Sequence, residues 1–328
     1  MLRLPPFEYH RPDTVEEAVE LLDRHGGDAM PVAGGTDVMP NMKHRLHEPG
    51  HLVGLKGIPE LAGVERENGE VVVGAAETLT GVASSGTIRE HFPSLAEAAG
   101  NVAGPQLRNM GTLGGNLCLD TRCTYYNQTE EWREALGYCL KKDGDTCHVT
   151  GVGTSCVAAH SADTPPVLML LGATAELASP DGRREIAVKD FFTADGEWNQ
   201  KRASEEIVTR IRIPVPDEGV RTGYAKLRQR KSVDFPLLTV AVLARTADDG
   251  TVEAIAGVVT GLGARPRVLT GWERIAVGER LDDEVVEALA EKARAQCHPL
   301  ENRIEDAEWR EAMVAVYARK ALQKLRAG

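Results

Sequence analysis

The sequence predicts an α+β fold, in which helices and sheets form separate layers. Residues 52–83 alternate the short apolar runs HLVGL and EVVVGA with turns, and a helix is expected from TLTGVASS to about His91. Later, GYAKLRQRKSVDFPLLTVAVLART and VEAIAGVVTGLG are rich in strand-forming residues, with one helix possible over residues 234–242. From Asp282 to Leu325, two amphipathic helices are separated by a break at His298 and Pro299.

The first part of the chain begins with an extended segment and a helix. Asp13 or Thr14 is expected to cap this helix, which ends at the glycine pair 26–27. A short strand over residues 30–33 then runs into the loop GGTD at residues 34–37. Adjacent glycines after a strand let the backbone turn tightly and direct several N–H groups at one anion, such as a pyrophosphate. A plain glycine turn explains the same residues equally well.

A second glycine loop, GTLGGN at residues 111–116, has similar chemistry and directly precedes a cysteine-rich stretch. Two such loops could bind the two ends of a long, phosphate-bearing cofactor. Asp163 follows the cysteines and precedes an apolar helix, VLMLLGA. Its carboxylate could accept hydrogen bonds from ribose hydroxyls or cap that helix, and the local sequence favours the cap. No GxGxxG pattern supports a Rossmann domain.

The best linker candidate is PVPDEG at residues 214–219. We therefore expect a first domain over residues 1–217 and a second over residues 218–328. Four basic residues lie early in the second domain, and they are either a solvated strand face or a contact for an anionic cofactor or acidic partner. They are Lys226, Arg228, Arg230 and Lys231.

Composition excludes several classes of protein. The formal net charge is -11, with 5% aromatic residues, which argues against a nucleic-acid partner. No run of 18 apolar residues is present, so a membrane span is not expected. The N-terminal residues contain no hydrophobic signal core, which predicts a cytoplasmic protein. Clustered cysteines in that reducing compartment are typical of metal or redox sites rather than disulfides.

Five of the six cysteines lie between residues 118 and 160. Four of these, which have fifteen, seven and eight residues between successive members, can converge only if turns such as KDGD and GVG fold the chain back. The spacing matches neither the usual zinc pairs nor a bacterial ferredoxin, so it predicts a four-thiolate site without naming the metal. Buried, inert thiols are the alternative. Lone histidines such as His91 and His160 are expected to be structural.

The order of the motifs is more specific than any one of them. AGGTD, TLGGN, SADTPP, YAKLRQRKSVDFP and HPLENRIEDAEWR follow one another through nearly the whole chain. This succession resembles the flavin-binding medium subunits of the molybdenum hydroxylase family, which includes xanthine and carbon monoxide dehydrogenases. The resemblance implies a two-part FAD-binding domain of the PCMH (vanillyl-alcohol-oxidase-like) type and a C-terminal domain of the CO dehydrogenase flavoprotein type.

The resemblance also implies how the cofactor is bound. The AGGTD segment would surround the FAD pyrophosphate, the second glycine loop would form the opposite wall, and Asp163 would contact the adenosine ribose. The implied FAD-binding residues are Met30, Pro31, Val32, Ala33, Gly34, Gly35, Thr36, Asp37, Val102, Thr112, Gly115, Asn116, Asp163, Val208 and Lys226.

In this family the TLGGN and SADTPP segments stand close together, whereas here the cysteine stretch at residues 118–160 separates them. An insertion of this kind is similar to the one in the beta subunits of 4-hydroxybenzoyl-CoA reductases, which carry an additional 4Fe-4S cluster. The similarity implies that the cluster ligands are Cys123, Cys139, Cys147 and Cys156, and that Cys118 and Cys297 are not ligands.

This similarity implies an electron-transfer subunit of an anaerobic, aromatic-degrading enzyme. Electrons from ferredoxin would reach a molybdenum subunit that reductively dehydroxylates 4-hydroxybenzoyl-CoA to benzoyl-CoA. The chain has no molybdopterin or 2Fe-2S pattern, so those groups are expected on a large and a small partner in a dimer of heterotrimers. Two alternatives remain. One is an FAD subunit of a hydroxylase that passes electrons outward from molybdenum to an acceptor, and the other is a non-enzymatic scaffold whose cysteines bind zinc.

Overall fold

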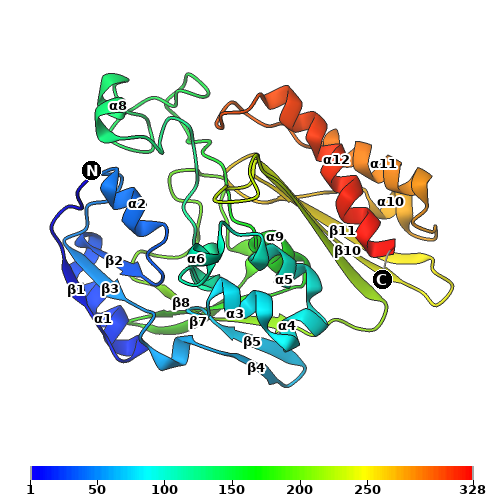
Figure 1. Ribbon diagram of the computed structural model, residues 1–328, viewed down its shortest axis with the longest axis horizontal. Coiled ribbons are helices and arrows are strands. Elements are labelled where there is room, and N and C mark those ends of the chain that lie inside the picture. Colours follow the sequence, from blue (N-terminus) through cyan, green and yellow to red (C-terminus); the bar gives the residue numbers. More distant parts are fainter. Residues whose placement is uncertain (1, 327–328) are drawn as a thin grey trace.

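Three β-sheets organise the chain, and the computed structural model describes residues 2–326. A three-stranded and a five-stranded sheet lie in the N-terminal part, and a four-stranded sheet lies in the C-terminal part (Figure 1). Helices pack on these sheets as separate layers, so the predicted α+β class is confirmed. The division expected at residues 217 and 218 falls between the last strand of the five-stranded sheet and the first strand of the four-stranded sheet.

The three-stranded sheet is parallel, in the order β1 (Glu8–His10), β3 (His51–Gly54), β2 (Ala29–Val32). It packs against α1 (Val15–His25), as predicted, and the Thr14 hydroxyl caps this helix by accepting a hydrogen bond from the Glu17 N–H. Gly26 ends α1 with a positive φ of 53°. The first glycine loop therefore leaves the carboxyl end of β2 and leads into α2 (Val38–Lys43).

The five-stranded sheet is antiparallel, in the order β4 (Val64–Glu67), β5 (Glu70–Gly74), β8 (Ile207–Pro214), β6 (Thr174–Ser179), β7 (Gly182–Ala187). Its apolar face forms one core with α3 (Leu79–Ser84), α4 (Gly86–His91), α5 (Pro93–Gly100), α7 (Leu113–Leu117) and α9 (Pro165–Leu170). The single helix predicted up to His91 is wrong. Ser85 interrupts it, because its hydroxyl accepts from the Ile88 N–H and starts α4.

The C-terminal sheet is also antiparallel, in the order β12 (Arg267–Val268), β11 (Val252–Thr260), β10 (Leu238–Thr246), β9 (Val220–Leu227). The helix allowed over residues 234–242 is wrong, since that segment enters β10, where most residues are buried on both faces. Val240 and Val242 face the core with α11 (Asp283–Arg294) and α12 (Ala307–Arg326), the two predicted helices. Ala241 faces the opposite way, into the core of the five-stranded sheet.

Short elements complete the fold. They are the 3₁₀ turns η1 (Gly26–Asp28), η2 (Pro59–Leu61) and η3 (Val188–Asp190), and the helices α6 (Pro105–Arg108), α8 (Glu130–Ala135) and α10 (Glu273–Ala276). The cysteine stretch contains α8 and otherwise consists of turns; it extends beyond the sheets in green at the top of Figure 1. No helix within residues 2–326 combines the length and the apolar character needed to cross a membrane.

His160 is fully buried at the boundary between the two parts of the chain. Its backbone N–H donates to the carbonyl of Gly263, and its ring meets the edge of Phe192 with centroids 4.7 Å apart. Neither ring nitrogen has a hydrogen-bond partner within the described residues. Burial lowers the pKa of His160 to about 3, so the folded protein holds this imidazole neutral, as a structural residue.

We expect replacement of His160 by Gln to weaken the pH dependence of stability in acid. The imidazole has an ordinary pKa of 6.5 when unfolded and about 3 when folded, so the unfolded chain binds more protons between these values. The wild-type free energy of unfolding should therefore fall by up to about 1.4 kcal/mol per pH unit from this residue as the pH decreases below 6.5. Urea denaturation from pH 7 to pH 4.5 measures the free energy of unfolding of both proteins. An equal dependence on pH in the wild type and in His160→Gln would contradict the neutral, buried state of His160.

Candidate functional site

A deep cleft of about 1100 Å³ lies between the N-terminal and C-terminal parts. Both glycine loops line it, together with residues of the cysteine stretch and of the loop between β9 and β10. Most of the residues that the resemblance implied converge here, although they come from five separate segments. Those lining the cleft are Met30, Pro31, Ala33, Gly34, Gly35, Thr36, Asp37, Val102, Thr112, Gly115, Asn116, Asp163 and Val208. Val32 and Lys226 do not line the cleft.

The first glycine loop presents free backbone donors to the cleft. Within residues 2–326, the N–H groups of Gly34, Gly35 and Thr36 donate no hydrogen bond to the protein. Gly35 has a positive φ of 68°, a conformation that favours glycine, and α2 begins just beyond the loop. Several unpaired N–H groups in a tight turn form an anion-binding concavity, so the loop fits a pyrophosphate.

The two glycine loops are in direct contact. A Cβ atom at Gly34 would collide with the backbone carbonyl of Met110, which immediately precedes the second loop. The second loop is held in turn by the end of β5, because the Gly114 N–H donates to the carbonyl of Ala75 at 2.9 Å. Only glycine at position 34 therefore allows the two walls of the cleft to approach this closely.

The second loop is continuous with the segment that carries Asp163. Thr112 caps α7 by accepting from the Gly115 N–H at 3.0 Å. The Asn116 side-chain oxygen accepts from both the N–H and the hydroxyl of Thr164, at 3.0 and 2.7 Å. Thr112 and Asn116 therefore shape the wall of the cleft through contacts within the protein.

Asp163 does not cap the helix that follows it, so that expectation is wrong. Thr164 occupies the position before α9, without a side-chain cap. The Asp163 carboxylate instead accepts from the Tyr224 hydroxyl at 2.6 Å and from Lys226 Nζ at 3.0 Å, with both charged side chains almost fully buried. Burial raises the pKa of Asp163 and lowers that of Lys226, and their mutual attraction opposes both shifts.

The basic residues near the start of the second domain have separate roles. Lys226 and Arg228 both donate to the carbonyl of Asn101 at 3.0 Å, and so hold the end of α5 beside Val102. Arg230 pairs with Asp234 and has a side chain that is 70% exposed. The run is therefore partly a buried anchor and partly a solvated surface, and the direct contact of Lys226 with FAD stays a prediction.

Cys123, Cys139, Cys147 and Cys156 line one small cavity in the cysteine stretch. The predicted turns bring them together: Gly151 donates to the Cys147 carbonyl, and a Cβ at Gly144 would lie 2.8 Å from the Cys139 nitrogen. Cys297 lies in the C-terminal core, and Cys118 lines the cleft.

Two of the sulfurs that line this cavity, those of Cys147 and Cys156, have hydrogen-bond donors beside them. Burial opposes ionisation of Cys147, but the Thr150 hydroxyl and nearby backbone N–H groups outweigh it and lower the pKa of this thiol. Burial raises the pKa of Cys156 to about 12, although the Ala158 N–H donates to its sulfur at 3.5 Å. Backbone N–H donors of this kind stabilise thiolates that bind metal and tune the potential of iron-sulfur clusters.

The four sulfurs are not gathered as closely as ligands of one bound zinc ion would be. Tetrahedral zinc with bonds of about 2.3 Å requires sulfurs about 3.8 Å apart. Within the described chain, no three of these sulfurs lie within 4.8 Å of one another.

The cysteine cavity and the cleft share Cys123, which lines both. Its neighbour Arg122 is buried and forms an ion pair with Asp37 of the first glycine loop. The Arg122 guanidinium also lies over the ring of Phe235, 4.5 Å from its centroid. Burial lowers the pKa of Arg122 to about 10, which leaves it charged at neutral pH.

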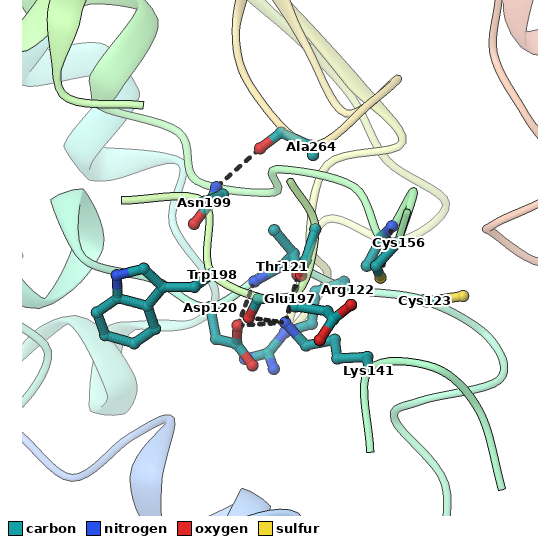
Figure 2. Close-up of polar contacts among 12 residues, drawn as sticks. Asp120, Thr121, Arg122, Cys123, Lys141, Cys156, Glu197, Trp198, Asn199 and Ala264 are labelled. Carbon is teal, nitrogen blue, oxygen red and sulfur yellow. Dashed lines mark hydrogen bonds and ion pairs between the residues drawn. The ribbon is translucent and has the colours of Figure 1, made fainter. Parts of the chain in front are cut away.

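A second charged residue, Lys141, fixes the stretch from the other side. Its Nζ donates to Asp120 Oδ1 at 2.7 Å, to the Thr121 hydroxyl at 2.7 Å and to the Gly196 carbonyl at 2.6 Å (Figure 2). The Gly196 N–H donates to the carbonyl of Cys156. Sequence reasoning missed Arg122 and Lys141, because no local pattern connects either residue to partners more than 50 positions away.

Comparisons with known proteins identify the family. The family of the FAD binding domain in molybdopterin dehydrogenase matches residues 5–216, and that of the CO dehydrogenase flavoprotein C-terminal domain matches residues 223–325. The chain belongs to the FAD-binding medium subunits of the molybdenum hydroxylases. It is therefore a flavoprotein subunit of an oxidoreductase, and the expectation of FAD as its cofactor is confirmed at the level of the family.

Individual relatives cover almost the whole chain. The carbon monoxide dehydrogenase medium chains of Afipia carboxidovorans and Hydrogenophaga pseudoflava are 31% and 32% identical to it, over 98% and 97% of this chain and 97% and 96% of their own. A solved structure of the Hydrogenophaga pseudoflava enzyme superposes with a TM-score of 0.81 at 30% identity, covering 99% of both chains. The fold class implied by the resemblance is confirmed.

We expect replacement of Gly34 by Ala to lower both stability and FAD content. The added Cβ would meet the Met110 carbonyl and push the two glycine loops apart, at a cost of about 1–3 kcal/mol. FAD per purified chain should fall below about half of the wild-type value, and Tm should fall by several degrees. In the control Gly57→Ala, the Cβ meets nothing within 4 Å and both quantities should be unchanged. Normal FAD content in Gly34→Ala would refute the close approach.

We expect replacement of Arg122 by Gln to destabilise the protein by about 2 kcal/mol. Removing one partner of a fully buried pair costs about 3–5 kcal/mol, and the Asp37 side chain is 28% exposed, which reduces the effect. The exposed pair of Arg45 with Glu48 provides the control, and Arg45→Gln should change stability by less than about 0.5 kcal/mol. Urea denaturation measures the free energy of unfolding of both variants. An equal loss in Arg122→Gln and Arg45→Gln would show that the buried pair of Arg122 with Asp37 does not stabilise the protein more than an exposed pair.

Proposed function

We propose that this chain binds FAD and a 4Fe-4S cluster and serves as the electron-transfer subunit of a molybdenum enzyme of the 4-hydroxybenzoyl-CoA reductase type. The observation that carries the proposal is the convergence of four cysteines, distant in sequence, on one cavity that shares Cys123 with the flavin cleft. Electron transfer requires cofactors to lie close together. A cluster in the cysteine cavity would be a neighbour of a flavin in the cleft, because Cys123 lines both.

In this proposal, Cys123, Cys139, Cys147 and Cys156 hold the cluster, which supplies one-electron chemistry when bound. The residues around it contribute position and electrostatics. Backbone N–H groups near Cys147 and Cys156 offer hydrogen bonds to sulfur, and Lys141 places a positive charge beside the anionic thiolates. Arg122 holds the same segment against the flavin-binding loop through Asp37.

The flavin would be held by the residues that line the cleft. The free N–H groups of Gly34, Gly35 and Thr36 fit its pyrophosphate, and Val102 and Val208 provide apolar walls. Asp163 would contact the adenosine ribose from its position in the cleft wall, and Lys226 would hold that carboxylate in place. Bound FAD exchanges electrons with one-electron and two-electron partners, whereas the protein positions it and tunes its electronics.

The proposed direction of electron flow is inward, from reduced ferredoxin to the molybdenum subunit. There, two electrons and two protons convert 4-hydroxybenzoyl-CoA to benzoyl-CoA and water, in an anaerobic pathway of aromatic degradation. A further cluster on this subunit is a suitable entry point for a low-potential donor. The partners would be a molybdopterin-binding large subunit and a 2Fe-2S small subunit, in a dimer of heterotrimers in the cytoplasm.

A second candidate is supported by the similarity to carbon monoxide dehydrogenase medium chains. In that reading, electrons leave the molybdenum subunit and pass outward to an acceptor at FAD, and the cysteines are inert or bind zinc. Assays of the purified complex separate the two. Ferredoxin-dependent release of benzoyl-CoA supports the first reading, whereas oxidation of a carbon substrate with dye reduction and no dehydroxylation supports the second.

We expect replacement of Cys139 by Ala to remove the iron and acid-labile sulfide of the anaerobically purified subunit while FAD stays bound. Loss of one of four thiolate ligands should reduce cluster occupancy by at least about ten-fold, whereas Cys139 does not line the flavin cleft. Cys297→Ala is the matched control, because Cys297 is equally buried but lies in the C-terminal core. Full iron content in Cys139→Ala would refute the ligand assignment, and zinc in place of iron in the wild type would refute the 4Fe-4S cluster.

A further inference from the structure

Three histidines meet on the far edge of the three-stranded sheet, outside the flavin cleft. His10 ends β1, His51 begins the neighbouring strand β3, and His25 ends α1, which packs on the same sheet. None of the three lines the cleft or the cysteine cavity. The parallel pairing of β1 with β3 and the end of α1 at Gly26 place the three imidazoles together.

The ring nitrogens are close enough to share one ion. One ligand atom from each of His10, His25 and His51 lies within 4.8 Å of the other two, the one such group in residues 2–326. His10 Nε2 and His51 Nδ1 are 3.0 Å apart, and the rings of His25 and His51 are stacked with centroids 3.7 Å apart. Nitrogens bound to one tetrahedral zinc at about 2.0–2.1 Å would be about 3.4 Å apart. This spacing lies between the 3.0 Å of the His10–His51 pair and the 4.8 Å that bounds the whole group.

Several charged and titratable groups lie close to the three rings. Burial, the neighbouring His51 and His10, and Arg24 all lower the pKa of His25. The Glu8 carboxylate also faces the group, and its Oε2 lies 3.7 Å from His51 Nδ1.

We propose that His10, His25 and His51 form a binding site for a divalent transition-metal ion such as Zn²⁺. Neutral imidazole is the preferred ligand of zinc, copper and nickel, whereas magnesium and calcium require oxygen ligands. Three protein nitrogens leave at least one coordination position for water or for the Glu8 carboxylate. The bound ion joins β1, β3 and the end of α1, and so stiffens the sheet from whose β2 the first glycine loop emerges.

The experiment compares zinc binding by the purified flavoprotein and its variants. Zn²⁺ is titrated in competition with a chromophoric chelator at pH 7.5, using wild type, His25→Gln, His10→Gln and the control His91→Gln. His91 is a partly buried histidine at the end of α4, beside Glu90, and it does not belong to the three-histidine group. All four proteins carry the same cysteines, so zinc bound by thiols contributes equally and cancels in the comparison.

The wild type and His91→Gln should bind one more equivalent of zinc than His25→Gln and His10→Gln, or bind it at least about ten-fold more tightly. Zinc should also raise Tm in the first pair by more than in the second pair. Equal stoichiometry and affinity in all four proteins would overturn the proposal and leave a hydrogen-bonded imidazole stack. As a control for folding, the Tm of His25→Gln and of His10→Gln is also measured without zinc.

Discussion

The cleft depends on a buried charge cluster between the two parts of the chain. Asp163 accepts hydrogen bonds from Tyr224 and Lys226 of β9, and Lys226 in turn reaches the carbonyl of Asn101 at the end of α5. Removing either Asp163 or Lys226 would leave the other charge buried and unpaired, a penalty of about 3–5 kcal/mol. The cluster therefore holds the C-terminal sheet against the second glycine loop and keeps the cleft open between them.

The cysteine stretch is joined to this framework at charged residues that are mostly buried. Arg122 pairs with Asp37 of the first glycine loop, and Lys141 is surrounded by oxygens from Asp120, Thr121 and Gly196. The C-terminal part contributes as well, since the Asn302 side chain donates to the carbonyl of Val157 at 2.7 Å. A stretch with little regular structure is thus held rigidly where its cavity meets the cleft.

Family membership and individual specificity rest on different parts of the molecule. The overall fold is shared with carbon monoxide dehydrogenase medium chains across nearly the whole chain. The cysteine cavity is what suggests a particular branch, because four cysteines line it and one of them, Cys123, also lines the cleft. The histidine group lies on another edge and is independent of both.

The sequence by itself determined the α+β class, most helices and strands, the glycine loops and the four cysteines as a possible site. These features follow from local rules, since periodicity, capping and turn residues act over a few positions. It could not determine that Asp163 faces β9 instead of capping α9, that Arg122 pairs with Asp37, or that His10, His25 and His51 meet. Only the tertiary structure decided these contacts, because their partners are distant in the chain and no spacing pattern records which buried charges or lone pairs will face one another.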